Sequence, residues 1–505
     1  MGIKGYFTTM KERFTPLTLD QIGKGVVFVD GHIMAHQIAN MVDPGSRYDM
    51  RAVAMKLEEL FTCWIGQHKW NIQLVLFDGL VPTDKMDSRR KRALDSLPTA
   101  LHAQSLALTV LCGALCLDTI QAKFPNVPCL VSPGEADHDL ACLVFNYAKL
   151  NPNTPVHIIS NDSGFCAFDF PDNVHIVNTL VGGLENSVLY ALPVTRTVTN
   201  WIGVKPTLLA YSVMKHSGRG PSQAKKYEDE EGYLEFSQQQ QQLLAKAGYS
   251  SVGEYLAEPI TRRAYQIFGQ QHDELLMHSA ANAWIEYGYA YVLLPVMCEP
   301  KEFEYAFDAG RRWRSVAYEI CASRLTQVFP EKDLVTSHVR EFVRIGETLG
   351  EMDVPITDAE RVRYNKTGSH YQLFQKDELL RAVKTWKTTD LINAIWIELA
   401  ATSPNVRNTK LEYDANHMRD RVVKYLKEAW NEEGMFNLKR LSRKERKLMA
   451  RKACAMDAID RRFFNKLVAC FQSLRMLQSV GVKFPVDVHL YDLDGTRWMS
   501  MTKGK

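Results

Sequence analysis

Acidic side chains follow several short apolar runs in the first third of the sequence. They are Asp30 after GVVFV, Asp78 after IQLVLF, Glu135 and Asp137 after PCLVSPG, and Asp162 after VHIISN. If these runs are parallel strands, their carboxyl ends form one edge of a sheet, where ligands bind in this class of fold. Carboxylates gathered there repel one another unless cations lie between them. The pattern predicts a site for Mg²⁺ or Mn²⁺, and two such ions can activate water and stabilise a departing phosphate oxygen.

A structural interpretation competes with the metal site at each of these positions. An Asp directly after a strand is often a turn former or a helix N-cap. Glu135 and Asp137 would also be favoured by the helix dipole if a helix begins there. The coincidence of acids at four strand ends favours the metal site, although the pattern itself names no metal.

Short β-branched runs alternate with helical segments over roughly the first 225 residues, which predicts an α/β domain with a mostly parallel central sheet. The expected strands are Val26–Val29, Ile72–Phe77, Cys129–Val131, Val156–Ile159 and Val174–Val177, and the expected helices include Met50–Trp64 and Leu101–Leu117. The strands are almost continuously apolar, as strands buried on both faces are. After Tyr227 the pattern becomes mostly helical. We therefore predict an α/β domain over residues 1–227 and a largely α-helical C-terminal region over 228–505.

Composition excludes several classes of protein. The 505 residues include 61 Lys and Arg against 58 Asp and Glu, a net charge of +3, so nucleic acid would have to bind through local basic patches. The apolar runs are far shorter than the ~20 residues that cross a bilayer, and we expect no membrane partner. Ten cysteines without a CxxC pair are typical of reduced intracellular thiols.

The ordered motifs MGIKG, VVFVDG, LVLFDG, SPGEADHDLA and IISNDSGFCAFDF resemble the flap endonuclease/XPG superfamily over roughly residues 1–220. The phrases EADHDLA and SNDSGFCAFDF are most similar to its asteroid branch. The resemblance implies a PIN-like α/β nuclease domain that hydrolyses phosphodiesters at junctions or single-stranded ends with two divalent metals. By position, Asp30, Asp78, Glu135 and Asp137 match the ligands of the first metal, and Asp162 matches a ligand of the second.

The sequence departs from the family pattern at the second metal. Gly164 stands where the family has the second acid of an Asp-x-Asp pair. The stretch LLAYSVMKHSGRG lacks the family's last Asp, and His216 or Tyr211 takes its place, depending on the alignment. Two hypotheses follow. The chain is a structure-selective endonuclease of this type, or it is a catalytically inactive relative that binds nucleic acid or scaffolds an RNA–protein complex.

Basic residues follow Asp78 directly in LVPTDKMDSRRKR. Lys85 and Arg92 lie seven residues apart, about two helical turns, so on one helix they would share a face with Arg89 close by. Their distances from Asp78 match those of the phosphate-contacting Lys and Arg of flap endonucleases. We expect Lys85 and Arg92 to hold the scissile phosphate, and the competing interpretation is a solvated basic helix.

Glycines and lysines in SGRGPSQAKKY resemble the helix–two-turn–helix hairpin of the same family. Gly218 and Gly220 would let the backbone approach a phosphate, and Lys225 would add charge. A plain turn is the competing interpretation.

Other basic segments are weaker candidates. The stretch Leu438–Lys452 is either the solvated face of a helix or a segment for nucleic-acid contact and nuclear import, which favours the nucleus over the cytoplasm. The cluster from Arg311 to Arg314 favours a surface helix, and the competing interpretation is a site for stacking or phosphate binding. His32 and His36 are expected to pack on the first helix of the α/β domain. The C-terminal region is a candidate surface for protein partners.

Overall fold

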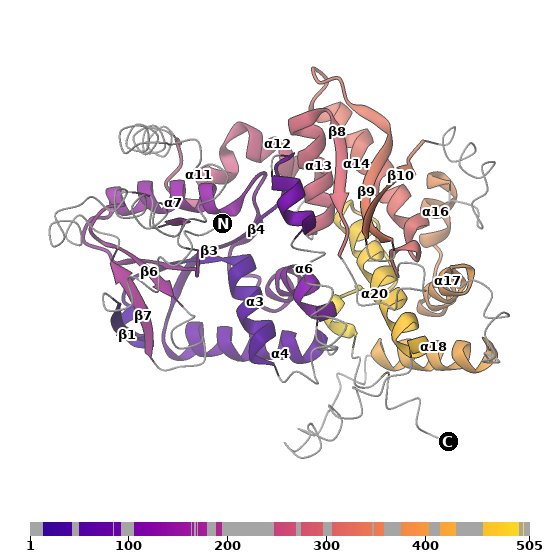
Figure 1. Cartoon of the computed structure of the whole chain (residues 1–505), viewed down its shortest axis with the longest axis horizontal. Coiled ribbons are helices and arrows are strands. Elements are labelled where there is room, and N and C mark those ends of the chain that lie inside the picture. The colour runs from indigo at the N-terminus through magenta and orange to yellow at the C-terminus, as the bar shows by residue number, and fades with distance from the viewer. Residues whose placement is uncertain are drawn as a thin grey trace, which may run out of the picture. The chain divides into compact units, whose positions relative to one another are not determined.

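The computed structural model of the chain contains an α/β sheet domain and a largely helical remainder (Figure 1). The residues that the structure describes are 14–42, 50–83, 85–91, 106–162, 164–165, 168, 170–178, 188–193, 247–268, 274–295, 306–345, 348–357, 375–402, 415–430, 458–493 and 498. This architecture confirms the predicted fold class, a mostly parallel α/β sheet followed by a largely α-helical region.

The central sheet has seven strands among the described residues, in the order β1-β7-β6-β5-β2-β3-β4. They are β1 (Thr15–Thr18), β2 (Val26–Asp30), β3 (Asn71–Phe77), β4 (Cys129–Val131), β5 (Val156–Ile159), β6 (Val174–Asn178) and β7 (Val188–Pro193). The strands from β6 through β4 are parallel, whereas β7 pairs antiparallel with both β6 and β1. The sheet is therefore parallel through its centre and antiparallel at one side.

The apolar runs of the sequence form the buried strands of this sheet. All residues of β2 and β5 are buried, as expected for strands covered on both faces. Helix α7 (Ala136–Leu150) covers the sheet with Leu140, Leu143 and Val144, which pack with strand residues such as Phe28 and Ile158. All five predicted strands are confirmed, whereas the outer strands β1 and β7 were not predicted.

The helices of the first part of the chain follow the predicted alternation. They are α2 (Leu19–Ile22), α3 (Gly31–Met41), α4 (Met50–Phe61), α6 (Leu106–Lys123) and α7, with a π-helical segment at Thr62–Gln67 after α4. The predicted helix over Met50–Trp64 is thus α4 with the start of the π-helical segment. The helix predicted over Leu101–Leu117 is α6, which begins at Leu106 among the described residues and continues to Lys123.

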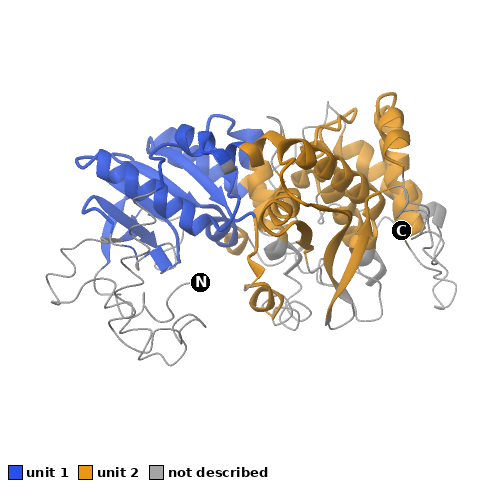
Figure 2. Ribbon diagram, turned by 90° about the horizontal axis from the view of Figure 1, so that it is seen from above, with its two compact units in different colours: residues 1–38, 56–79, 120–262 blue, residues 39–55, 80–119, 263–505 orange. Residues whose placement is uncertain are grey.

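The chain divides into two compact units, which Figure 2 colours separately. Unit 1 consists of residues 1–38, 56–79 and 120–262 and contains the whole central sheet. Unit 2 consists of residues 39–55, 80–119 and 263–505. Segments of the first 227 residues therefore belong to unit 2, and the predicted boundary at 227/228 lies outside the described residues.

The C-terminal region is largely helical and also contains a small sheet. Its elements are α11 (Val252–Ala257), α12 (Pro259–Phe268), α13 (Leu275–Tyr287), β8 (Tyr289–Leu293), α14 (Arg311–Val328), β9 (Val335–Ile345), β10 (Thr348–Pro355), α16 (Lys376–Val383), α17 (Thr388–Ala401), α18 (Ala415–Ala429) and α20 (Ala458–Ser479). Within the described part of the chain, β10, β9 and β8 form a three-stranded sheet in that order. The sequence interpretation missed this sheet.

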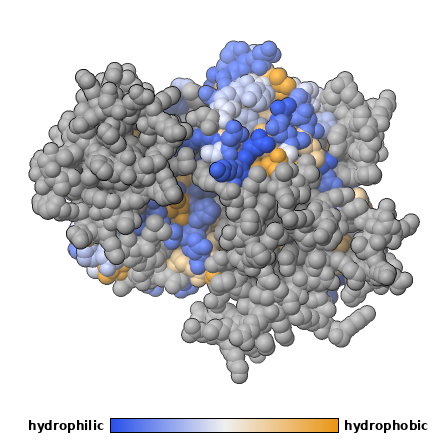
Figure 3. All heavy atoms as spheres, viewed as in Figure 1, coloured by the Kyte–Doolittle hydropathy of each residue, from blue (hydrophilic) through white to orange (hydrophobic). Residues whose placement is uncertain are grey.

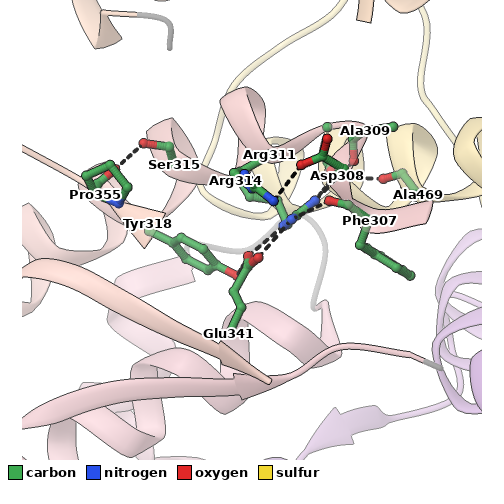
Figure 4. A network of polar contacts seen from close by, with 12 residues as sticks. Phe307, Asp308, Ala309, Arg311, Arg314, Ser315, Tyr318, Glu341, Pro355 and Ala469 are labelled. Carbon is green, nitrogen blue, oxygen red and sulfur yellow. Dashed lines mark hydrogen bonds and ion pairs between the residues drawn. The ribbon is translucent and has the colours of Figure 1, made fainter. Parts of the chain in front are cut away.

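The basic cluster at the start of α14 is buried, so the prediction of a surface helix was wrong. Arg314 is fully buried, and its Nε and Nη2 atoms donate to the two carboxylate oxygens of Glu341 at 2.7 and 2.9 Å (Figure 4). Tyr318 donates its hydroxyl to the same carboxylate at 2.9 Å. Arg312 pairs with the buried Glu398, at 2.6 Å from Nη2 to Oε2. These arginines can lie in the core because acids far away in the sequence neutralise their charges.

None of the described helices is both long enough and apolar enough to cross a bilayer. On the face that Figure 3 shows, the described residues are largely hydrophilic, with smaller hydrophobic areas between them.

Candidate metal centre

The predicted carboxylates lie at the carboxyl ends of strands that are neighbours in the sheet. In the spatial order β5-β2-β3-β4, Asp162 follows β5, Asp30 ends β2, Asp78 follows β3, and Glu135 and Asp137 follow β4. The chain runs from β2 outward through β3 to β4 and then returns to place β5 on the other side of β2. The order reverses between β2 and β5, and such a switch point is where open parallel sheets bind ligands.

Asp30 is buried at the centre of this edge. Its Oδ1 atom accepts from the backbone N–H of Ile33 at 3.1 Å, and its Oδ2 atom accepts from the hydroxyl of Ser160 at 2.9 Å. Burial raises the pKa of Asp30 to about 7, with further contributions from the nearby charges of Asp78 and Asp162. The side chain is therefore positioned by hydrogen bonds while its negative charge is disfavoured.

Asp78 is fixed by contacts from two elements. Its Oδ1 atom accepts from the backbone N–H of Ala136 at the start of α7, at 2.9 Å. Its own backbone N–H donates to Nδ1 of His32 at 3.1 Å. The His32 ring packs edge-on against Phe77, with ring centroids 5.5 Å apart, as a packing residue should. The second role of His32, holding the Asp78 backbone, was not predicted, and the His36 side chain is exposed.

The acids at the start of α7 differ in their surroundings. Glu135 occupies the N-cap position with extended backbone, and its side chain makes no capping hydrogen bond to the helix. Asp137 lies in the first helical turn and is half-buried. Burial raises the pKa of Asp137 to about 8, with further increases from the charges of Asp30, Asp162 and Asp78. The charges of Asp30, Asp78 and Asp162 are therefore close enough to Asp137 to disfavour its ionisation.

Asp162 is linked to Asp30 through a shared serine. The backbone N–H of Asp162 donates to the hydroxyl oxygen of Ser160 at 3.0 Å, and that hydroxyl donates to Asp30. The Oδ1 atom of Asp162 accepts from the backbone N–H of Gly164 at 2.7 Å. Ser160 was not selected from the sequence, although it lies in the motif IISND.

A second unpredicted residue, Asp139, lies in the first turn of α7 and accepts several hydrogen bonds. Its Oδ2 atom accepts hydrogen bonds from the hydroxyls of Ser132 at 2.6 Å and Tyr255 at 2.8 Å. The Ser132 hydroxyl oxygen in turn accepts from the backbone N–H of Gly134 at 3.0 Å. This network shapes the loop that carries Glu135. Its position in EADHD, two residues after Asp137, was the only available signal.

The donor chemistry of the edge fits a hard divalent cation, because its side chains supply carboxylate oxygens whose mutual repulsion a cation would relieve. Among the described residues, however, no three His, Cys, Asp or Glu side chains converge closely enough to hold one metal ion. Oxygens of Asp30 and Asp78 are engaged by backbone and serine donors instead. Binding a cation would therefore require rotation of carboxylate side chains.

The predicted nucleic-acid contacts are only partly described. Lys85 and Arg89 lie in the helical residues 85–91 of unit 2 and are both half-buried. The described helix agrees with the helical placement assumed for this basic segment. Arg92, Gly218, Gly220 and Lys225 lie outside the described residues, as do Tyr211 and His216.

Comparisons with solved structures match catalytic cores of Rad2. No family model and no curated protein match the chain. The catalytic core of Rad2 in complex with DNA substrate matches with 16% identity and a TM-score of 0.29, covering 41% of this chain and 59% of that one. The catalytic core of Rad2 in a second structure matches with 13% identity and a TM-score of 0.27, covering 57% of this chain and 96% of that one. At these values the chemistry of the site has to rest on its own residues.

Proposed function

We propose that this chain is a divalent-metal-dependent phosphodiesterase that cuts nucleic acid, a structure-selective endonuclease of the flap endonuclease/XPG type. The observation that supports the proposal is the row of carboxylates at the carboxyl ends of β5, β2, β3 and β4, at the switch point of a parallel sheet. The raised pKa values of Asp30 and Asp137 indicate that this edge carries more negative charge than the fold itself needs. The motifs EADHDLA and SNDSGFCAFDF favour the asteroid branch.

Different residues of the chain would take different roles in such a reaction. Asp30 and Asp78 are held on rigid strand ends by hydrogen bonds, which suits ligands of a first cation, Mg²⁺ or Mn²⁺. Glu135 and Asp137 would complete that set, and Asp162 would contribute to a second. When bound, the cations would lower the pKa of water and neutralise charge on the phosphate. Lys85 and Arg89 would hold phosphates of the substrate.

Cleavage of labelled flap, overhang and single-stranded DNA and RNA, in Mg²⁺ and in Mn²⁺, tests the proposal. The parent should cut at least one substrate, and chelation should stop it. Asp78→Asn keeps an oxygen that can accept from Ala136 but removes the charge, so cleavage should fall by roughly a hundredfold or more. Asp20→Asn is the matched control, because Asp20 is an exposed partner of His68 in the same unit.

The alternative hypothesis, an inactive relative that binds nucleic acid or scaffolds an RNA–protein complex, makes the opposite prediction. Gly164 at the place of a second-metal acid is the feature that favours it. A parent protein that binds the labelled substrates, cuts none of them in either metal, and binds equally well after Asp78→Asn would establish this alternative.

A further inference from the structure

The segment that follows Asp78 packs on the three-stranded sheet of unit 2. Leu80 and Met86 are buried in a cluster with Tyr291 of β8, Phe342 of β9 and Ala283 of α13. All of these residues belong to the same unit. A segment that begins two residues after a candidate metal ligand is therefore anchored by residues more than 190 positions later in the sequence.

Hydrogen bonds fix the backbone at the start of this segment. The Tyr291 hydroxyl donates to the backbone carbonyl of Val81 at 2.6 Å. The backbone N–H of Thr83 donates to the hydroxyl of Tyr287 at 3.4 Å. Tyr287 and Tyr291 are themselves stacked, with ring centroids 5.9 Å apart. The entry to the basic helix is thus held by a pair of tyrosines.

Arg90 fastens the described part of the helix to the same sheet. Its guanidinium carbon lies 4.9 Å from the centroid of the Phe342 ring, in a cation–π contact. Its Nη2 atom donates to the carbonyl of Leu349 at 3.4 Å, and Nη1 lies 3.6 Å from Oε1 of Glu351. The guanidinium of Arg90 is therefore engaged in contacts with the sheet.

Helical spacing indicates which basic residues lie beside the face that contacts the sheet. Met86 and Arg90 are four residues apart, so they share the face that contacts the sheet. Lys85 and Arg89 are also four residues apart and share the neighbouring flank. Any rotation of the helix about its axis would move both of these charges together.

We propose that the three-stranded sheet of unit 2 is the positioning platform for the basic helix, and that Tyr291, Phe342 and Arg90 are positioning residues that aim Lys85 and Arg89 at the phosphates of a nucleic acid. The inference rests on the proposed function, since it assumes that this flank contacts the substrate. It gives the C-terminal region a role in substrate binding that is separate from the carboxylate edge.

Two charge-conserving variants test the platform. Arg90→Lys keeps the charge but loses the planar stacking on Phe342, and Tyr291→Phe keeps the ring but loses the hydrogen bond to Val81. We expect each to weaken binding of a fluorescent 20-nucleotide single strand. The slope of log affinity against log salt should fall by ~0.7 for each phosphate that the protein no longer neutralises. Because neither change removes a charge, a shallower slope reports displaced lysine and arginine side chains.

Arg340→Lys is the matched control. Arg340 pairs with the same Glu351, at 3.6 Å, and with Asp353 at 3.2 Å on the same sheet. It should leave the salt slope unchanged. A slope that changes equally in Arg340→Lys and Arg90→Lys would overturn the platform, as would parental slopes in both Arg90→Lys and Tyr291→Phe.

The double substitution Lys85→Ala and Arg89→Ala separates this inference from the proposed function. It should lower the salt slope by ~1.4, and adding Arg90→Lys to it should produce little further change. If the double variant has the lower slope while Arg90→Lys keeps the parental one, the platform fails and the nucleic-acid contact stands. If the double variant binds like the parent, or the parent does not bind, the substrate role of the helix fails, and the platform with it.

Discussion

Unit 1 and unit 2 both bury carboxylates, and the groups that surround those carboxylates differ. In unit 2, Glu341 is fully buried and receives two hydrogen bonds from Arg314. In unit 1, Asp30 is buried, and the charged side chains that act on its pKa are the acids Asp78 and Asp162. One acid is neutralised inside the protein, whereas the other lies among like charges.

The comparison distinguishes buried charges that stabilise the fold from buried charges that destabilise it. A buried ion pair keeps its place because breaking it would leave an uncompensated charge in the core. Acids that raise one another's pKa reduce stability, and such groups are concentrated at functional sites. The carboxylate edge of unit 1 is therefore the part of the structure on which the proposed metal binding depends.

The largest expected effect is in unit 2. Glu341→Gln leaves Arg314 buried without a counter-charge, and the free energy of unfolding should fall by ~3 to 5 kcal/mol. Urea denaturation followed by fluorescence measures it. Glu331→Gln removes an exposed partner of Arg263 and should leave the free energy of unfolding almost unchanged. Equal losses in the two variants would contradict the distinction.

Two substitutions on α7 should act in opposite directions. Asp139→Asn weakens the acceptor of the Ser132 and Tyr255 hydroxyls, and the free energy of unfolding should fall by ~1 to 3 kcal/mol. Asp137→Asn removes the cost of burying and protonating this acid and should raise the free energy of unfolding by ~0.5 to 2 kcal/mol in metal-free buffer. Thermal and urea unfolding with a chelator present provide the comparison. A loss in both variants would show that Asp137 is a structural acid.

Introducing an acid at position 164 tests whether charge limits metal binding at the carboxylate edge of unit 1. Gly164 does not have the positive φ that favours glycine, and an added Cβ would lie 3.1 Å from Oδ1 of Asp162. Gly164→Asp should raise Mn²⁺ affinity roughly tenfold, equivalent to ~1.4 kcal/mol. Calorimetric titration measures this gain, and Gly164→Asn controls for the size of the side chain. A gain in the Asn variant as well would exclude charge as its cause.

The smallest expected effect concerns a compensated acid and its dependence on pH. Asp118 on α6 lies 3.0 Å from Nη2 of Arg475 and 2.8 Å from Nδ1 of His489. The pKa of Asp118 is lowered because Arg475 and His489 outweigh the opposing effect of burial. The pKa of His489 is raised because Asp118 outweighs the same opposing effect.

The sign of the pH dependence follows from these two shifts. The Asp118 contribution is present above its ordinary pKa of 3.8 and is lost as pH falls through the lowered value. The His489 contribution is present below 6.5 and is lost as pH rises through the raised value. Stability should therefore decline by ~1 kcal/mol above neutral pH in the parent and less in His489→Gln. Urea midpoints at pH 5.5 and pH 9 should reveal it, and identical declines would exclude His489.

The sequence predicted the central sheet well because its strands carry a local signal. Strands such as β2 and β5 are buried on both faces, so each appears as an unbroken apolar run. The positions of Asp30 and Asp78 at strand ends followed directly. Whether any three of these acids converge on one ion depends on hydrogen bonds from Ser160 and Ala136, which no local pattern encodes.

The misread parts of unit 2 depend on partners that are distant in the sequence. In β9, the core-facing series Val339, Glu341 and Val343 contains an acid, so the alternation expected of a half-buried strand is broken. That acid is buried because Arg314 meets it 27 residues away. The same separation made the arginines of α14 look like a solvated surface. Neither Arg314 nor Glu341 could be recognised as buried from its local sequence alone.

The contacts of Asp118 impose an order of events during synthesis of the chain. Helix α6 leaves the ribosome long before His489, which is 371 residues later. At roughly 5 to 20 residues per second, translation takes about 20 to 70 seconds to supply that partner. During that interval the Asp118 carboxylate, which is buried in the folded protein, lacks the His489 imidazole and the Arg475 guanidinium that will neutralise it. Completion of unit 2 is therefore expected only after His489 has been synthesised.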